Sequence, residues 1–158
     1  MPEGPEGRSL VSPDLVRLGL PSTDRRSAVL LAGELLVSAG CVRPEYVDGM
    51  LAREGTMSTY LGNGVAMPHG DFGARDQVLR MGICVLQYPD GIVWGPDELA
   101  TLVVGLAATE EEHITVLMNL AEVIEDEATA RLLATTDDVA VIVERLTRPV
   151  EDLDDDPE

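Results

Sequence analysis

The stretch MGICVLQYPDGIVWGPDELATLVVGLA, residues 81–107, decides the fold of this chain. It contains two apolar runs, residues 81–88 and 99–107, in which apolar and polar residues hardly alternate. Such runs are typical of strands that are buried on both faces of a sheet. Between them, Pro89-Asp90-Gly91 predicts a turn, and residues 92–94 are expected to pair at an edge.

Helices and short strands are expected on either side of this strand pair. A cap at Ser22 or Thr23 opens a helix that runs to about Ala39, and a second helix follows Pro44 and stops near Gly55. The remaining expected elements are short strands over 58–61 and 65–67, a turn at 62–64, a helix opening at the capping-box sequence 109–112, and helices over 127–134 and 137–146. Helices that flank doubly buried strands indicate an α/β fold, a single layered domain with a central mixed β-sheet flanked by helices.

Composition narrows the classes of partner. The chain has 158 residues and a net charge of -18, and we expect a disordered N-terminus over 1–9, one folded domain over 10–148 and an acidic disordered tail over 149–158. The acidic balance argues against binding to nucleic acid or to anionic membranes, and it permits a basic protein partner. No apolar stretch reaches the roughly 20 residues of a membrane span, so direct membrane insertion is not expected.

No cofactor or metal is expected. The chain has no Lys, which excludes a P-loop, and the glycines at 62 and 64 do not continue into a dinucleotide fingerprint. Cys41 and Cys84 lie in apolar sequence and are expected to be free buried thiols in a reducing cytoplasm. Neither cysteine lies at metal-ligand spacing from the other or from the two histidines, so a metal site is not predicted.

His69 is the first candidate for chemistry, in the stretch LGNGVAMPHG, residues 61–70. Pro68 restricts the backbone before the histidine, and Gly70 removes a side chain beside it. An imidazole near neutral pH is a good nucleophile and a tolerable leaving group, which suits reversible phosphoryl transfer. The alternative is a loop histidine that only forms hydrogen bonds to its own neighbourhood.

His113 and Arg53 are two further candidates. His113 is expected in the first turn of the helix that opens at Thr109, where a neutral imidazole can donate to a phosphate oxygen. Arg53 lies just before the predicted helix end, and a guanidinium fork binds phosphoryl oxygens with two hydrogen bonds. The alternatives are an ordinary surface histidine on a helix and a solvated surface pair of Arg53 with Glu54.

Taken together, these motifs resemble a known family. The resemblance is carried by MLAREGTMSTYLGNGVAMPHG over 50–70, GICVLQYPDGIVWG over 82–95 and LVVGLAATEEEHITVLMNLAEVIED over 102–126, with LLVSAGCVRPEYV over 35–47 in agreement. The stretch from Tyr46 to about Leu146 resembles the IIA domain of the mannitol/fructose class of the bacterial phosphoenolpyruvate-dependent sugar phosphotransferase system. The Gln-Tyr-Pro-Asp-Gly stretch resembles mannitol-type members more than the other branches.

The resemblance implies a phosphotransferase component that works through a phosphohistidine. It implies that His69 is phosphorylated on Nε2, that His113 lies beside it and that Arg53 supports the phosphoryl group. The implied donor is phosphorylated HPr, and the implied acceptor is a cysteine on the IIB domain of a sugar transporter. With no IIB or IIC sequence attached, the chain would be a free-standing cytoplasmic IIA protein that serves mannitol-type sugar uptake.

One residue departs from the family pattern, because many members have Thr after Pro-His-Gly and this chain has Asp71. Two alternatives to the transport function stay open. In the first, the chain is a regulatory module whose docking to a partner depends on phosphorylation of His69. In the second, it is a degenerate homologue that folds normally and takes up no phosphoryl group because of Asp71.

Overall fold

The computed structural model of the chain describes residues 13–70, 76–107, 118, 120, 122 and 124–147. Several predictions lie outside these residues: both terminal segments, Asp71, His113 and the expected helix start at 109–112. In the described part of the chain, no helix is both long enough and apolar enough to cross a membrane.

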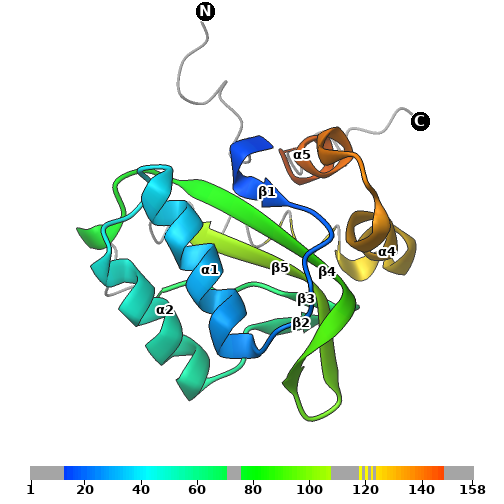
Figure 1. The fold of residues 1–158 in the computed structure, drawn as a ribbon, viewed down its shortest axis with the longest axis horizontal. Helices are drawn as coiled ribbons and strands as arrows, with labels where there is room; N and C mark the ends of the chain where they lie inside the picture. The colour runs from blue at the N-terminus through cyan, green and yellow to red at the C-terminus, as the bar shows by residue number, and fades with distance from the viewer. Residues whose placement is uncertain are drawn as a thin grey trace, which may run out of the picture.

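The centre of the fold is a five-stranded mixed sheet (Figure 1). Its strands are β1 (Val16–Arg17), β2 (Tyr60–Gly62), β3 (Val65–Ala66), β4 (Gly82–Gly95) and β5 (Glu98–Ala107). They lie in the order β1-β4-β5-β3-β2. The pairs β1–β4 and β3–β5 are parallel, and β4–β5 and β2–β3 are antiparallel. The predicted mixed sheet and α/β fold are confirmed.

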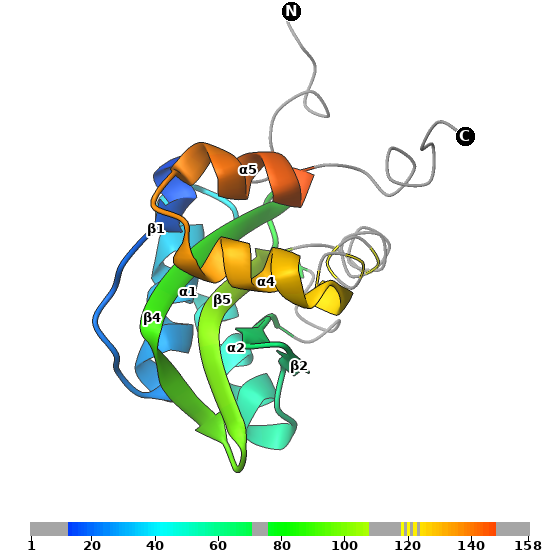
Figure 2. The ribbon, with the colours of Figure 1, turned by 90° about the vertical axis from the view of Figure 1, so that its right-hand side faces the viewer.

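Helices cover the sheet. The described helices are the short 3-10 helix η2 (Pro13–Leu15), α1 (Arg25–Ser38), α2 (Glu45–Thr56), α4 (Glu127–Thr135) and α5 (Val139–Thr147). Figure 2 shows α4 and α5 on the side of the sheet opposite α1 and α2. The helices predicted after Pro44, over 127–134 and over 137–146 are confirmed to within three residues.

Strand β4 contributes to two separate cores because it is apolar on both faces. Cys84 and Leu86 belong to the core beneath α1 and α2, whereas Ile83 and Val85 belong to the core beneath α4 and α5. All four side chains are at most 1% exposed. Successive residues of a strand point to opposite faces, so an unbroken apolar run is what a two-sided core requires. The prediction of strands buried on both faces is confirmed.

The predicted turn at Pro89-Asp90-Gly91 is wrong. These residues lie inside β4, in a bulge where residues 88–91 oppose only Thr101 of β5 between the pairs Gln87–Leu102 and Ile92–Ala100. Proline fits a bulge because it has no N–H to donate to the ladder, and Gly91 supplies a φ of +84°. The chain instead reverses after Gly95, where Asp97 adopts a φ of +63°.

Two features near the N-terminus also differ from expectation. The cap of α1 is Asp24, whose side chain accepts a 2.7 Å hydrogen bond from Ser27 N, and not Ser22 or Thr23. The hydroxyl of Ser22 donates to Gly91 O instead, at 2.6 Å. Strand β1 was not predicted, because two residues are too few to show periodicity.

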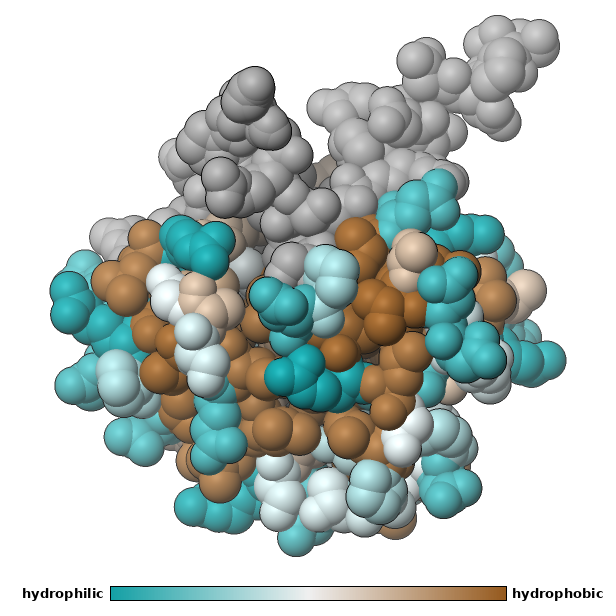
Figure 3. All heavy atoms as spheres, turned by 45° about the horizontal axis from the view of Figure 1, so that its top comes forward, coloured by the Kyte–Doolittle hydropathy of each residue, from teal (hydrophilic) through white to brown (hydrophobic). Residues whose placement is uncertain are grey.

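The surface is not uniformly polar. Figure 3 shows apolar residues gathered around single hydrophilic ones on the face that is turned forward there. Among the described residues, eight large apolar side chains are exposed: Leu30, Met57, Leu61, Leu79, Val93, Leu99, Met118 and Leu132. Two of these, Met57 and Leu61, flank the chain segment that leads from α2 into β2.

Candidate functional site

His69 follows β3 and lies beside β5. The residue forms a parallel bridge with Leu106, and Leu106 N donates to Pro68 O at 3.0 Å. Pro68 has no N–H of its own, so its carbonyl oxygen is the group that can tie this peptide to the sheet. His69 is therefore held just beyond the end of a strand, and its side chain is partly buried.

The ring of His69 has a defined orientation. Its Nδ1 lies 2.8 Å from Met67 O. A carbonyl oxygen can only accept, so Nδ1 carries the proton in this contact. In the neutral ring the lone pair then belongs to Nε2, which is the nitrogen that would attack an electrophile.

A buried carboxylate supports the segment that precedes His69. Glu54, in α2, is 5% exposed, and its Oε2 accepts from Thr59 N at 2.9 Å while its Oε1 accepts from the Thr59 hydroxyl at 2.6 Å. Trp94 Nε1 also donates to Oε2, at 2.8 Å. Thr59 O in turn accepts from Met67 N at 3.0 Å. These hydrogen bonds, from Glu54 through Thr59 to Met67, form an arm that connects α2 to the carbonyl group that holds the ring of His69.

A buried tyrosine supports the other side of His69. The hydroxyl of Tyr46 donates to Leu106 O at 2.9 Å and accepts from Gly70 N at 2.9 Å. A Cβ atom on Gly70 would lie 2.7 Å from Cε1 of Tyr46. Glycine is therefore required after His69 because the tyrosine ring occupies the space that any side chain would need.

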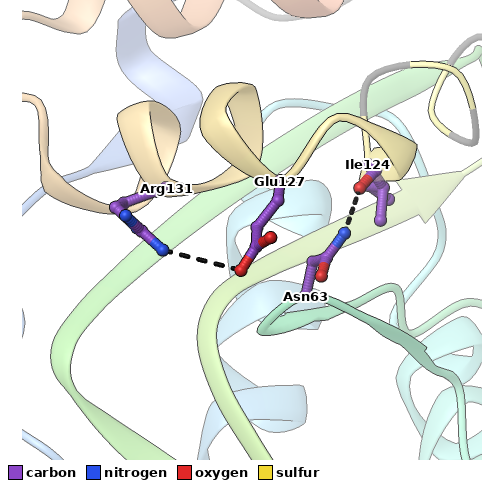
Figure 4. Close-up of polar contacts among 4 residues, drawn as sticks. All are labelled: Asn63, Ile124, Glu127 and Arg131. Atoms are coloured by element: carbon purple, nitrogen blue, oxygen red, sulfur yellow. Dashed lines mark hydrogen bonds and ion pairs between the residues drawn. The ribbon is translucent and has the colours of Figure 1, made fainter.

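The backbone conformation of the turn before β3 accounts for the Gly-Asn-Gly sequence of that turn. Gly62, Asn63 and Gly64 all have positive φ, which glycine and asparagine tolerate best. The side-chain amide of Asn63 donates to Ile124 O at 2.6 Å (Figure 4). Ile124 is helical, and an amide donor at such a carbonyl satisfies a group that a helix end leaves unpaired. The turn is thereby tied to the helical residues that precede α4.

Arg53 lies in the last turn of α2, next to Glu54. Its Nη1 donates to Met57 O at 2.7 Å. Met57 N in turn donates to Arg53 O at 3.1 Å, so both contacts lie at the end of α2, and the role of Arg53 toward a phosphoryl group on His69 stays a prediction. The interpretation of Arg53 and Glu54 as a solvated surface pair is wrong for Glu54, which is buried. His113 is outside the described residues, so its place beside His69 stays a prediction.

The two cysteines are free and buried, as predicted. Burial raises the pKa of Cys84 to about 12, and its thiol donates to Ala32 O at 3.4 Å. Burial also raises the pKa of Cys41. Thiols with raised pKa values are poor nucleophiles, so neither competes with an imidazole for an electrophile. Within the described ranges, no cluster of three or more His, Cys, Asp or Glu residues is arranged to hold a metal ion.

Sequence reasoning missed Glu54 and Tyr46 as parts of the site. Tyr46 was given no role at the site, and Glu54 was considered only as a partner of Arg53. Their roles depend on Thr59, Met67 and Gly70, which lie up to 24 residues away along the chain. The available signal was the charge of Glu54 in a helix whose inward positions are apolar, because a charge that is buried needs partners.

Comparison with known proteins gives a consistent result. Residues 9–148 match the family model described as "Phosphoenolpyruvate-dependent sugar phosphotransferase system, EIIA 2". A multiphosphoryl transfer protein of Xanthomonas campestris is 50% identical over 137 residues, which are 87% of this chain and 16% of that protein. The chain spans 16% of the length of a multiphosphoryl transfer protein of Rhodobacter capsulatus and 23% of the length of a mannitol-specific EIICBA component of Pasteurella multocida.

Two solved structures from Escherichia coli resemble the chain closely. The crystal structure of IIA mannitol has a TM-score of 0.79 and 41% identity, and covers 85% of this chain and 97% of its own. A complex of enzyme IIA mannitol with phosphorylated enzyme IIB mannitol gives the same TM-score and identity over 84% of this chain and 94% of the matched one.

Proposed function

The chain belongs to the EIIA 2 family of the phosphoenolpyruvate-dependent sugar phosphotransferase system, and on that premise we propose that His69 carries the phosphoryl group between two protein partners. The observation that carries the proposal is the 2.8 Å contact of Nδ1 with Met67 O, because it assigns the lone pair of the neutral ring to Nε2. A carrier needs a nucleophile whose orientation is set before the donor arrives.

The proposed transfer consists of two successive displacements at phosphorus. The lone pair of Nε2 attacks the phosphorus of phosphorylated HPr, an N–P bond forms, and the bond to the donor breaks with its electron pair on the donor. A cysteine thiolate of a IIB domain then attacks the same phosphorus, and the electron pair of the N–P bond returns to Nε2. The proton on Nδ1 stays in place throughout, held by Met67 O.

Arg53 and His113 are proposed to stabilise the equatorial phosphoryl oxygens. Phosphoryl transfer has a loose transition state, so positioning and charge contribute most of what a protein can add. Arg53 already uses Nη1 on Met57 O, which fixes its fork at the end of α2. His113 would donate one N–H from the start of the helix predicted after Thr109.

The likeness to IIA mannitol supports a proposal for the acceptor. The 41% identity with that protein, and with the IIA chain of a complex that contains phosphorylated IIB mannitol, supports a mannitol-type IIB domain as the acceptor. We place the transfer in the cytoplasm, where both protein partners would meet the chain.

Intact-mass analysis tests this proposal. The protein is incubated with phosphoenolpyruvate, enzyme I and HPr, beside the variants His69→Ala and His113→Ala. One acid-labile phosphoryl group is expected on the wild type and none on His69→Ala, while His113→Ala takes up the group more slowly. Equal labelling of His69→Ala would contradict the assignment of His69, and absence of label on the wild type beside an active control IIA protein would support the degenerate alternative.

A further inference from the structure

Glu54 is a buried acid, and both of its carboxylate oxygens accept hydrogen bonds. Its side chain accepts three hydrogen bonds, two from Thr59 and one from Trp94, and the residue is 5% exposed. Burying a carboxylate is costly unless donors replace the lost water, and here three donors do so. An apolar residue at this place in α2 would need no hydrogen-bond donors around it. The three hydrogen bonds to Glu54 therefore require an explanation.

The contacts of Glu54 lead directly to the ring of His69. Glu54 fixes both the backbone N–H and the hydroxyl of Thr59, Thr59 O accepts from Met67 N, and Met67 O accepts from Nδ1 of His69. Each link is between 2.6 and 3.0 Å long. The orientation of the Met67 carbonyl, and with it the proton on Nδ1, therefore depends on the position of Thr59.

We propose that Glu54 is a positioning residue that holds His69 in the Nδ1–H tautomer through Thr59 and Met67. The inference rests on the proposed function, since a phosphoryl carrier needs the lone pair on Nε2. Glu54 itself does not reach the reacting atoms. Its effect is to keep one ring nitrogen protonated and the other ready to attack, before the donor binds.

The geometry predicts a difference between two substitutions of Glu54. Oε2 receives two N–H donors of fixed direction, from Thr59 and Trp94, whereas Oε1 receives only the rotatable hydroxyl of Thr59. Glu54→Gln can place its amide oxygen at the first position and donate from its amide nitrogen to the hydroxyl. Glu54→Leu has a similar size and leaves all three donors without their acceptor. The first variant should preserve the arm and the second should break it.

The experiment measures the tautomer and the transfer rate separately. Nitrogen-15 NMR of the unphosphorylated protein at a pH where His69 is neutral reports which ring nitrogen carries the proton, and His113→Gln assigns the signals because the chain has two histidines. Rapid-quench labelling by phosphorylated HPr reports the rate. Glu54→Leu should shift His69 towards the Nε2–H tautomer and slow labelling by about tenfold to a hundredfold, the range for small misplacements of a reacting group. Glu54→Gln should match the wild type in both.

Two further variants separate positioning from general loosening. Gln87 is another buried polar residue, 3% exposed, which bonds Gly19 N, Leu133 O and Thr136 O away from His69. Gln87→Leu should lower stability and leave the tautomer unchanged. Thr59→Val replaces the hydroxyl with a methyl group and should give a smaller shift in the same direction as Glu54→Leu, whereas Thr59→Ser keeps the hydroxyl and should behave like the wild type. This pair keeps the test decisive if Glu54→Leu does not fold.

Each outcome of these measurements either supports or overturns the inference. A wild-type tautomer in folded Glu54→Leu, or in Thr59→Val when Glu54→Leu does not fold, would overturn the inference. So would an equal shift in Gln87→Leu, or a Glu54→Gln variant that behaves like Glu54→Leu. If the wild type accepts no phosphoryl group although its tautomer responds to Glu54, the proposed function fails while the positioning contact stands.

Discussion

The β4–β5 hairpin and the segment from Thr59 to Gly70 adjoin each other and are held by different forces. The hairpin is apolar on both faces, and most of its side chains between Ile83 and Leu106 are fully buried. The segment has only two short strands, β2 and β3. The side chains of Glu54 and Tyr46 bond to its backbone, and its own Asn63 side chain bonds to Ile124 O outside it. The hairpin relies mainly on buried apolar area, which has no direction. The segment also buries Val65, Ala66 and Met67, and it adds hydrogen bonds, which are directional.

This difference assigns stability and chemistry to different residues. Apolar burial holds the sheet together but cannot specify which way an imidazole points. Hydrogen bonds from a few buried polar groups contribute less free energy each, roughly 1 kcal/mol, and fix geometry instead. We therefore expect substitutions in the hairpin to act on stability first, and substitutions around the segment to act on transfer first.

The largest expected effect on stability is that of Leu86→Ala. Leu86 is fully buried at the centre of the hairpin, and loss of such a side chain costs about 3 kcal/mol. Urea unfolding monitored by circular dichroism measures the loss. Val93→Ala is the matched control in the same strand, because Val93 is 73% exposed and its truncation should stay within about 0.5 kcal/mol. Folded Leu86→Ala should accept phosphoryl groups at the wild-type rate. A large loss of rate would contradict the expectation that substitutions in the hairpin act on stability first.

Gly70→Ala should affect both stability and transfer. The added Cβ would lie 2.7 Å from the Tyr46 ring, so the tyrosine or the histidine segment must move, at a cost of about 2 kcal/mol. Because Tyr46 bonds Gly70 N and Leu106 O, the displacement should also slow labelling of His69. Gly55→Ala is the control: a Cβ there meets nothing within 4 Å, and transfer should be unchanged. Wild-type labelling of Gly70→Ala would show that the tyrosine arm does not set the position of His69.

The same contrast explains what could be predicted from the sequence. The hairpin strands were predicted because an apolar run of eight or nine residues is a local signal, and so were α2, α4 and α5. The bulge at 88–91 was mistaken for a turn because proline and glycine favour both, and only the register with β5 distinguishes them. At the site, His69 has a local motif. Arg53 and His113 were candidates from their residue chemistry, and the family resemblance then implied their place beside His69. The charge of Glu54 in a helix with apolar inward positions was a local signal, but the partners of Glu54 and Tyr46 do not show in local sequence, because Thr59 and Gly70 are brought to them by the fold.

Substitution of Asn63 separates two contributions within the segment. Asn63→Gly keeps the positive φ accessible and loses only the 2.6 Å bond to Ile124 O, which should cost about 1 kcal/mol. Asn63→Ala loses the same bond and keeps a Cβ at a φ of +51°, which alanine tolerates less well than asparagine and which costs roughly 1 kcal/mol more than glycine does there. Urea unfolding of both variants measures the two terms. Equal stabilities of the two variants would mean that the backbone relaxes to another conformation.

The smallest effect is expected at the exposed start of α1, the helix that packs on the hairpin. The backbone N–H of Ser27 donates to the Asp24 carboxylate and lowers the pKa of that group below 3.8. The folded state therefore binds this proton less readily than the unfolded state, so the contribution of Asp24 is present above 3.8 and is lost as the pH falls through the folded-state pKa. Asp24→Asn keeps an oxygen that can cap the helix and has no proton to gain. Thermal melts should show wild type more stable than Asp24→Asn at neutral pH, with the difference shrinking only below 3.8. A difference that stays constant over that range would mean that the cap acts through its geometry alone, as Glu54 is proposed to do at the site.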